Sequence, residues 1–524
     1  MNTEAPNTWS ETGYVTQTPY MRDFFRYQTP IAMSYAAADN GFDAPDCTQP
    51  FRYVDLGCGE AITLLVMAAS YPDAQFVGVD LNPTHIANAQ AIVDATGLEN
   101  LTLLNTTFDD QQIDALGPFD YVASHGVYSW VSTEVQSHLR VAAGRLLRVG
   151  GLFYMCHYVR PGAAKIEMLF AFLKSLMKDR PELDLEARAR AALQQARTLI
   201  DSGAPLFARY SSFEKEISAL EERDPRYLVH EFCNQYFTPG FLGDVFDDFA
   251  QEDLHHVGST REDRNNIRNL FASDMDTALS GLTWDQAEIR ASMLYFDAFR
   301  WDVFSKAASG RRPQRNGSID PFVFDAKIYP YRFSKTHTLW QREVNFDTPL
   351  FRAVINLVNR GQKTVSEVRQ DASLDTYQES SVRSLLRDMI ASREFQPLEQ
   401  PALRPQAEKG ATFHFTHPLS AALCARDLMA EGQINFPSQI IGGALQLSRF
   451  DALATWHLDG KSIDVGSMTL ARRIMGMEPD EVAALSLEKI QSKEGFIEAW
   501  RRFAQRTLPR LIKYGVMRTE SQAQ

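Results

Sequence analysis

Two carboxylates and two glycines near the start of the chain have the types and spacing of a nucleotide-binding site. Residues 53–60 read Tyr-Val-Asp-Leu-Gly-Cys-Gly-Glu, and residues 76–81 read Phe-Val-Gly-Val-Asp-Leu. The first segment is an apolar strand that runs into a glycine-rich turn, and the second is an apolar strand that ends in a carboxylate. Doubly wound α/β sheets hold a nucleotide at the carboxyl ends of such strands. The pattern therefore predicts a Rossmann-like sheet that binds an adenosine group.

The spacing within this turn selects among the nucleotide cofactors. Gly57 and Gly59 allow a sharp turn and a close approach of a ligand, but Ile62 breaks the Gly-x-Gly-x-x-Gly pattern of pyrophosphate-binding folds. A carboxylate at Asp55 would repel a phosphate and attract an amine. Asp80 follows the turn by about twenty residues and is placed to accept both ribose hydroxyls. The predicted cofactor is thus a phosphate-free adenosine that carries an amino acid, S-adenosylmethionine.

The following strands extend the same site. The short strand 101–104 ends before Phe108, which could lie against the adenine, while Asp109 or Asp110 could meet the adenine amino group. Apolar strands at 119–124 and 150–157 alternate with helical stretches, which predicts a parallel sheet with right-handed crossovers. The predicted cofactor contacts are Asp55, Gly57, Cys58, Gly59, Asp80, Leu81, Phe108, Asp109 and Ser124.

The composition bounds the class of protein. A chain of 524 residues, 44% hydrophobic and 23% charged, predicts a globular protein of two to four domains. No apolar run approaches the roughly 20 residues that span a bilayer, and the first residues lack the features of a signal peptide. The five cysteines are scattered without metal-ligand spacing. We therefore expect a cytoplasmic, reduced protein with no metal and no membrane span.

The net charge restricts the partners. A formal charge of −13 argues against nucleic acid, because binding a phosphate backbone requires clustered Lys and Arg. The same charge is compatible with a cationic substrate such as a lysine-rich segment, and it is equally compatible with solubility alone.

The pattern of helices, strands and linkers predicts three units. A charged, alanine-rich stretch reads as a helical insertion, and a strand at 253–260 is expected to close the sheet. Three helices followed by a short apolar run resemble a winged helix, whose basic residues are offset by acids, so that packing or protein contacts are favoured over DNA. The predicted units are an S-adenosylmethionine-binding domain at 1–262 with its insertion at about 182–222, a middle domain at 263–400 with the winged-helix-like part at 347–398, and a mostly helical C-terminal domain at 401–524.

Several segments together resemble one family. They are Gly13-Tyr14 with Pro19-Tyr20, the glycine motif at 55–60, His125-Gly-Val-Tyr-Ser-Trp-Val131, and Tyr227-Leu-Val-His-Glu-Phe232. The chain resembles class I S-adenosylmethionine-dependent methyltransferases of bacteria that carry a methyltransferase regulatory domain, among which are rickettsial outer-membrane-protein lysine methyltransferases. The resemblance covers about 1–262, extends less closely over 263–400, and implies methylation of protein lysines.

The chain departs from this family after the fifth predicted strand. Members continue into Asn-Ala-Leu-Pro-Gly-Trp, whereas this chain has His157-Tyr-Val-Arg-Pro-Gly. The departure lies at the mouth of the expected site. It therefore puts the identity of the substrate in doubt more than the chemistry of methyl transfer. His157 becomes a candidate substrate contact.

Methyl transfer from a sulfonium is an in-line displacement on carbon that needs an aligned, unprotonated nucleophile. For a lysine amine, desolvation lowers the pKa, and aromatic side chains can surround the amine. The loop after the fourth strand could form that cage, and Tyr14 could fold over the cofactor as a lid. The catalytic candidates are His125, Tyr128 and Tyr14, and the substrate candidates are Trp130, His157, His230 and Glu231.

Each of these candidates also has a purely structural interpretation. His125 could instead hydrogen-bond a backbone carbonyl, and His230 with Glu231 could cap a helix or bond within the core. Tyr128 and Trp130 could pack under the following helix; we favour the packing role for Trp130 and the functional role for Tyr128.

Three functions remain open from the sequence. The first is N-methylation of protein lysines, with the C-terminal half as a platform that docks the substrate or forms a homodimer. The second is methylation of a small molecule, such as a natural product or an envelope precursor, with the extra domains as a lid. The third is a cofactor-sensing scaffold without transfer, which the intact Asp55, Gly57, Gly59 and Asp80 disfavour.

Overall fold

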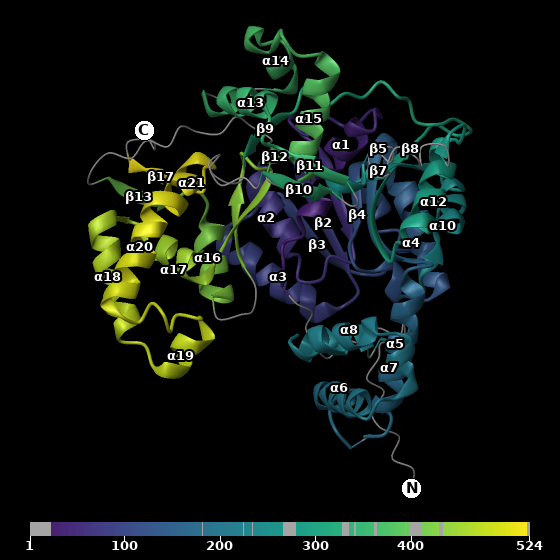
Figure 1. The fold of residues 1–524 in the computed structure, drawn as a ribbon, viewed down its shortest axis with the longest axis horizontal. Coiled ribbons are helices and arrows are strands. Elements are labelled where there is room, and N and C mark those ends of the chain that lie inside the picture. Colours follow the sequence, from purple (N-terminus) through teal and green to yellow (C-terminus); the bar gives the residue numbers. More distant parts are fainter. Residues whose placement is uncertain are drawn as a thin grey trace.

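A mostly parallel β-sheet lies at the centre of the molecule (Figure 1). The computed structural model describes residues 22–180, 182–223, 225–232, 234–265, 279–326, 335–339, 342–360, 364–392, 395–398, 411–428 and 433–520. The strand order is β3-β2-β1-β4-β5-β8-β7, with β6 beside β5. The strands are β1 (Arg52–Leu56), β2 (Gln75–Asp80), β3 (Leu101–Asn105), β4 (Phe119–Ser124), β5 (Leu147–Arg160), β6 (Gly240–Phe241), β7 (Leu254–Ser259) and β8 (Phe299–Lys306). The predicted Rossmann-like α/β sheet is confirmed.

Helices cover both faces of this sheet, which is why its central strands are buried along almost their whole length. One face packs against α1 (Pro30–Asp39), α2 (Ile62–Ser70) and α3 (Pro83–Thr96). The other face packs against α4 (Thr133–Leu146) and α10 (Leu242–Ala250), and α12 (Trp284–Tyr295) lies beside α10.

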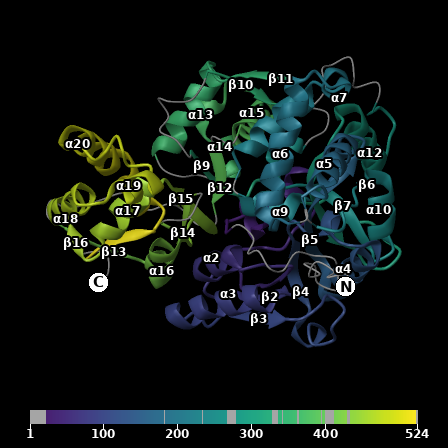
Figure 2. The same cartoon turned by 90° about the horizontal axis from the view of Figure 1, so that it is seen from below.

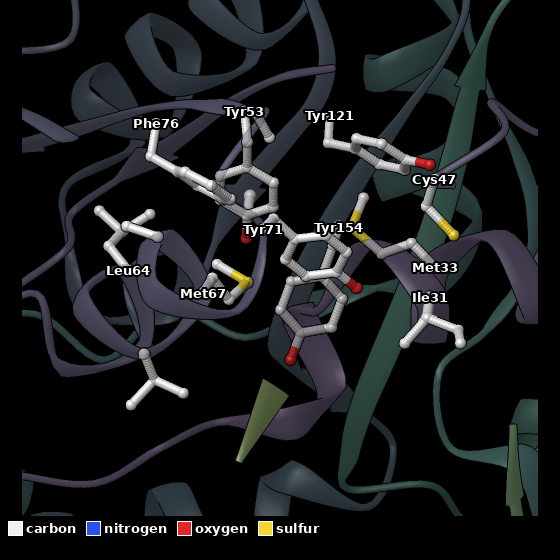
Figure 3. Packing of buried hydrophobic residues seen from close by; sticks show 14 of the residues in the cluster. Ile31, Met33, Cys47, Tyr53, Leu64, Met67, Tyr71, Phe76, Tyr121 and Tyr154 are labelled. Atoms are coloured by element: carbon white, nitrogen blue, oxygen red, sulfur yellow. The ribbon is translucent and has the colours of Figure 1, made fainter. Parts of the chain in front are cut away.

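Aromatic side chains fill the core under α1 and α2 (Figure 3). The rings of Tyr53 and Phe76, on neighbouring strands, have centroids 5.6 Å apart, and Tyr121 follows on β4. The Tyr53 hydroxyl donates to the Gln28 carbonyl at 2.8 Å, and the Ser34 and Tyr121 hydroxyls lie 2.8 Å apart. The first bond fixes the segment before α1 against the sheet, and the second fixes α1 itself.

The sheet does not close where the sequence predicts. β8 inserts antiparallel between β5 and β7, so the sheet continues to residue 306 and the expected domain end near 262 is wrong. The strand escaped sequence analysis because it carries two charged residues, Arg300 and Asp302, that are both buried. An isolated buried charge is costly, so such residues indicate a surface unless a partner is known.

Those charges satisfy one another in a buried network. Arg300 Nη2 lies 2.7 Å from Asp302 Oδ1 and 2.9 Å from Glu288 Oε2 on α12. The other Asp302 oxygen lies 2.8 Å from His157 Nε2 on β5, and His256 Nε2 on β7 lies 3.2 Å from Asp302 Oδ1. Burial alone would raise the pKa of Asp302, but Arg300 and both histidines hold it well below its usual range. The network therefore joins three strands and one helix.

Among the described residues, five helices that lie between β5 and β6 in the sequence form a separate group beside the sheet. These are α5 (Ala163–Met177), α6 (Leu185–Asp201), α7 (Pro205–Arg209), α8 (Ser212–Glu221) and α9 (Pro225–Phe232). They share one apolar cluster, which also includes Trp130 from the loop after β4. Through Trp130 this cluster ties the group to the carboxyl edge of the sheet. Figure 2 shows the helices α5, α6, α7 and α9 of this group from below.

The rest of the chain forms smaller layers beside the central sheet. A helical part follows β8 and is joined to the strand pair β9–β12, and a last unit contains its own small sheets. The elements are β9 (Val323–Ala326), β10 (Thr336–Leu339), β11 (Arg342–Asn345), α13 (Pro349–Arg360), α14 (Val365–Arg369), α15 (Glu379–Ala391), β12 (Phe395–Leu398), β13 (Thr412–Phe415), α16 (Pro418–Asp427), β14 (Ile434–Ser438), β15 (Gly443–Leu447), α17 (Arg449–Leu458), β16 (Lys461–Ser462), α18 (Ile463–Met475), α19 (Pro479–Ala484), α20 (Lys493–Arg502), α21 (Leu508–Lys513) and β17 (Met517–Thr519).

The β14–β15 hairpin fastens this last unit to α2. Ser70 Oγ donates to the Gly443 carbonyl at 2.9 Å and accepts from the Ser438 amide at 3.2 Å. The Tyr71 hydroxyl donates to the Gly442 carbonyl at 3.1 Å. No helix among the described residues is long and apolar enough to cross a bilayer.

Replacing the central arginine of the buried network tests whether the network holds the sheet together. Arg300→Met leaves the buried carboxylates of Asp302 and Glu288 without this cation, so we expect the free energy of unfolding to fall by about 3–5 kcal/mol in urea denaturation. Arg311→Met, at an exposed position, is the control and should change it by less than about 0.5 kcal/mol. Equal losses in the two variants would contradict the role of the network.

Candidate active site

A cavity of about 310 Å³ opens at the carboxyl edge of β1, β2, β4 and β5. The side chains that line it include five carboxylates and six aromatic rings, and among the described lining residues there is no Lys or Arg. The carboxylates are Asp23, Asp55, Glu60, Asp80 and Glu231, and the aromatic residues are Phe25, Phe108, Trp130, Tyr158, Tyr227 and Phe299.

The glycine turn forms one wall of this cavity. Gly57 has φ +90°, and its amide donates to the Val79 carbonyl at 2.8 Å. A Cβ at this position would lie 2.4 Å from a methyl carbon of Val127. Gly59 also has a positive φ, and its amide donates to Asp80 Oδ2 at 2.8 Å. The turn is thus bound to β2 and leaves its backbone open to the cavity.

Asp55 is a buried carboxylate with unused hydrogen-bonding capacity. It is 3% exposed, and Gln28 Nε2 lies 3.3 Å from Oδ2. Its Oδ1 is buried and has no hydrogen-bond partner among the described residues. Burial, with the nearby charge of Asp80, raises its pKa to about 7. A cationic donor in the cavity would satisfy this oxygen and favour the ionised form.

Most of the predicted cofactor contacts meet in this cavity. Those that line it are Asp55, Gly57, Cys58, Gly59, Asp80, Leu81 and Phe108. Two do not line it: Ser124 Oγ is buried and donates to the Leu56 carbonyl at 2.8 Å, and Asp109 is exposed to solvent. Ser124 points into the sheet because Leu56, on the adjacent strand β1, offers it an acceptor.

His125 lies in the wall of the cavity as an uncharged ring. Its ring stacks on Phe25 with centroids 3.8 Å apart, and Nδ1 lies 2.9 Å from the Tyr154 hydroxyl. Burial lowers the pKa of His125 to about 3. The hydrogen-bond partner is therefore a side-chain hydroxyl rather than the backbone carbonyl considered from the sequence.

Tyr128 and Trp130 differ in their place relative to the cavity: Tyr128, expected to be functional, packs away from it, whereas Trp130 both packs in the apolar cluster of α5–α9 and lines the cavity. Tyr128 does not line the cavity; its ring packs on Phe249, with centroids 5.7 Å apart, and burial raises its pKa to about 12. Trp130 does line the cavity, with its ring 4.8 Å from that of Phe237. The two residues lie in one 3₁₀ turn, where positions two apart differ by about 240° in direction.

His157 is also placed away from the cavity. β5 continues to Arg160 instead of ending at 157, so His157 lies inside the strand, where neighbouring side chains point to opposite faces. Cys156 and Tyr158 line the cavity, whereas His157 points away and bonds Asp302. The expectation of a substrate contact at His157 is wrong for this reason.

Helix α9 contributes His230 and Glu231, which both line the cavity. Glu231 is 6% exposed, and its Oε2 has no hydrogen-bond partner among the described residues. Burial raises the pKa of Glu231 to about 8, although Arg223 and Tyr227 act in the opposite direction. Tyr14 lies outside the described residues.

Sequence analysis missed several lining residues. Phe25 and Gln28 lie in the segment before α1, which has no periodic pattern, and Phe299 begins the strand that was not predicted. Tyr227 belonged to a segment that carried the family resemblance, and this signal could have identified it.

Comparison with known proteins places this site in a family. Residues 54–153 match the family model described as a methyltransferase domain. An uncharacterized protein of Synechocystis is 23% identical over 85% of this chain and 87% of its own length. An uncharacterized protein of Rickettsia prowazekii is 28% identical over 42% of this chain and 41% of its own length.

Among solved structures, PKMT2 from Rickettsia typhi in complex with AdoHcy is similar with a TM-score of 0.67. The similarity covers 90% of this chain and 99% of that chain, at 18% identity, and shows that the fold is shared. The family match thus shows a methyltransferase domain at 54–153, and the glycine turn and the strand order are those of the class I S-adenosylmethionine-dependent fold.

The glycine turn generates a test of the local geometry. Gly57→Ala should lower the free energy of unfolding by about 1–2 kcal/mol because of the positive φ, and by a further 1–3 kcal/mol or so because the new Cβ would clash with Val127. Gly97→Ala is the matched control, because Gly97 has φ +67° but open space around its Cβ position. Urea denaturation of both variants measures the difference, and an equal loss would show that Val127 does not confine the turn.

Proposed function

We propose that the chain transfers the methyl group of S-adenosylmethionine to the ε-amine of lysine side chains in a protein substrate. The observation that carries this proposal is the lining of the cavity, which has five carboxylates and six aromatic residues but no described Lys or Arg. Such a lining favours two cationic groups, the cofactor and an amine, because carboxylates and aromatic faces both attract cations.

The cofactor would occupy the end of the cavity formed by the glycine turn. Asp55 has a buried oxygen without a partner and would accept the ammonium of the amino-acid part. Asp80 would accept the ribose hydroxyls, and Phe108 would lie against the adenine. When bound, the cofactor supplies an electrophilic methyl group on sulfur.

The substrate amine would enter at the end formed by α9. There Glu231 would take the proton of an arriving lysine ammonium, with Tyr227 and Trp130 around it. The pKa of an ordinary carboxyl group lies about six units below that of a lysine ammonium. Because the pKa of Glu231 is raised to about 8, the difference between the two pKa values falls to roughly two units. Desolvation of the ammonium narrows it further. These residues would thus hold a free amine, with its lone pair available, toward the electrophilic methyl group that the bound cofactor would supply.

A protein substrate is supported by the similarity to the Rickettsia typhi structure, which extends over 90% of this chain. The similar Rickettsia typhi structure is of a protein lysine methyltransferase, and the similarity includes the units beyond the sheet. We infer that these units, about 307–520, form a platform that docks the substrate protein or a second copy.

Methylation of a small molecule is the second candidate. The observation that favours it is the helical group α5–α9, whose helix α9 supplies part of the wall of the cavity and packs on the other helices of the group. A helical group in this place could exclude a folded protein from the cavity and admit the amine of a metabolite.

The pKa of Asp55 predicts how cofactor binding depends on pH. Binding of the ammonium of S-adenosylhomocysteine requires ionised Asp55, so below pH 7 each unit should weaken binding about tenfold. Calorimetric titration between pH 5 and 8 measures this dependence. Methylthioadenosine, which lacks the amino acid, and the Asp55→Asn variant should both bind with little dependence on pH. A pH-independent affinity for S-adenosylhomocysteine in the unmodified protein would contradict the assigned contact.

The proton acceptor is tested by a variant that keeps the shape of the site. Glu231→Gln should lower kcat/KM for methyl transfer at least 100-fold and leave the Kd for S-adenosylhomocysteine within about threefold. Glu222→Gln, an exposed position nearby, is the control. Transfer by Glu231→Gln at the normal rate would remove Glu231 from the mechanism.

The substrate class is tested with labelled S-adenosylmethionine and an extract of cells that lack this chain. We expect label on a discrete protein band, with mass spectrometry placing the added methyl groups on lysine. Label only in the small-molecule fraction would replace the proposal by the second candidate.

A further inference from the structure

A second cavity of about 270 Å³ lies behind the wall of the active site. Its lining comes from the segment before α1, from α1 itself, from the residues after β7, from β12, from the β14–β15 hairpin and from α21. It is therefore built jointly by the methyltransferase sheet and the C-terminal unit.

The segment 23–29 separates the two cavities. Asp23, Phe25 and Gln28 line the active site, whereas Phe24, Arg26, Tyr27 and Thr29 line the second cavity. The active-site face of the segment is bonded to the catalytic wall, since Phe25 stacks on His125 and Gln28 contacts Asp55. The other face meets the hairpin, since a Cβ at Gly443 would lie 2.9 Å from the Phe24 ring.

Three polar atoms in the second cavity lack hydrogen-bond partners within the described part of the chain. They are the Tyr35 hydroxyl, Thr260 Oγ1 and Arg510 Nε, each of which is buried. Tyr35 and Thr260 are each only 2% exposed. Buried polar groups are nearly always paired, so three orphaned groups around one cavity indicate a missing ligand.

The chemistry of these groups selects an anion with an apolar body. Tyr35, Thr260 and Arg510 can all donate, and a guanidinium binds a carboxylate through two parallel bonds. The other arginine, Arg26, lies 3.1 Å from Glu262 and is already paired. The Glu262 carboxylate makes the cavity less suitable for a dianionic phosphate, and the side chains of Ile31, Ala444 and Leu445 suit a hydrocarbon.

We propose that this cavity is an effector site for a small carboxylate, held by Arg510, Tyr35 and Thr260. Its occupant would act on the methyl-transfer pocket through the shared segment 23–29. The site is independent of which substrate the enzyme methylates, because it needs only the cofactor pocket on the other side of that segment.

Calorimetric titration of the full chain with benzoate tests the site, with benzamide as the uncharged analogue and inorganic phosphate as the alternative anion. We expect benzoate to bind, and benzamide and phosphate to bind at least tenfold more weakly. Arg510→Gln and Tyr35→Phe should each weaken benzoate at least tenfold, whereas Arg501→Gln, at an exposed position, should not. Tyr35→Phe removes only an unpaired hydroxyl, so it should fold even if Arg510→Gln does not.

Absence of benzoate binding, equal binding of benzamide or phosphate, or unchanged binding in both variants would overturn the site. The effector role has its own readout. Saturating benzoate should change the Kd for S-adenosylhomocysteine at least threefold, and by reciprocity S-adenosylhomocysteine should change the Kd for benzoate by the same factor. Binding of both ligands without mutual effect would overturn that role.

Discussion

The active site depends on keeping two carboxylates, Asp55 and Asp80, close together at the edge of the sheet. Burial and the nearby charge of Asp80 raise the pKa of Asp55 to about 7. Asp80 itself accepts two backbone hydrogen bonds, from the Gly59 amide in the glycine turn and from the Asn82 amide after β2. Asp55 receives no hydrogen bond from a backbone amide among the described contacts. Its Oδ1 is therefore left to accept a hydrogen bond from a cationic ligand.

The remaining architecture keeps that pair in place. The central strands are buried by helices on both faces, the Tyr53 hydroxyl holds the segment before α1, and Gln28 in that segment reaches Asp55. β8 completes the sheet with charged residues that are neutralised inside the core. The C-terminal unit fastens its hairpin to α2, the helix that starts directly after the glycine turn. Distant parts of the chain thus converge on the same turn.

The sequence predicted those features that depend on local patterns. The sheet and the turn follow from strand, glycine and carboxylate spacing, and seven of the nine residues predicted to contact the cofactor line the cavity. The errors have a common cause, which is that side-chain direction depends on tertiary context. Ser124 turns inward to a carbonyl of the adjacent strand, and His157 points away from the cavity because its strand is longer than expected. β8 was missed because its charges are paired only in three dimensions.

The central claim is that the cavity is built for a cofactor cation at one end and a substrate amine at the other. A crystal structure of the chain with S-adenosylhomocysteine tests it most directly. We expect the ligand ammonium within hydrogen-bonding distance of Asp55, the ribose hydroxyls on Asp80, and the sulfur facing the part of the cavity lined by Trp130 and Glu231. An ammonium bound elsewhere, or a sulfur directed away from α9, would contradict it.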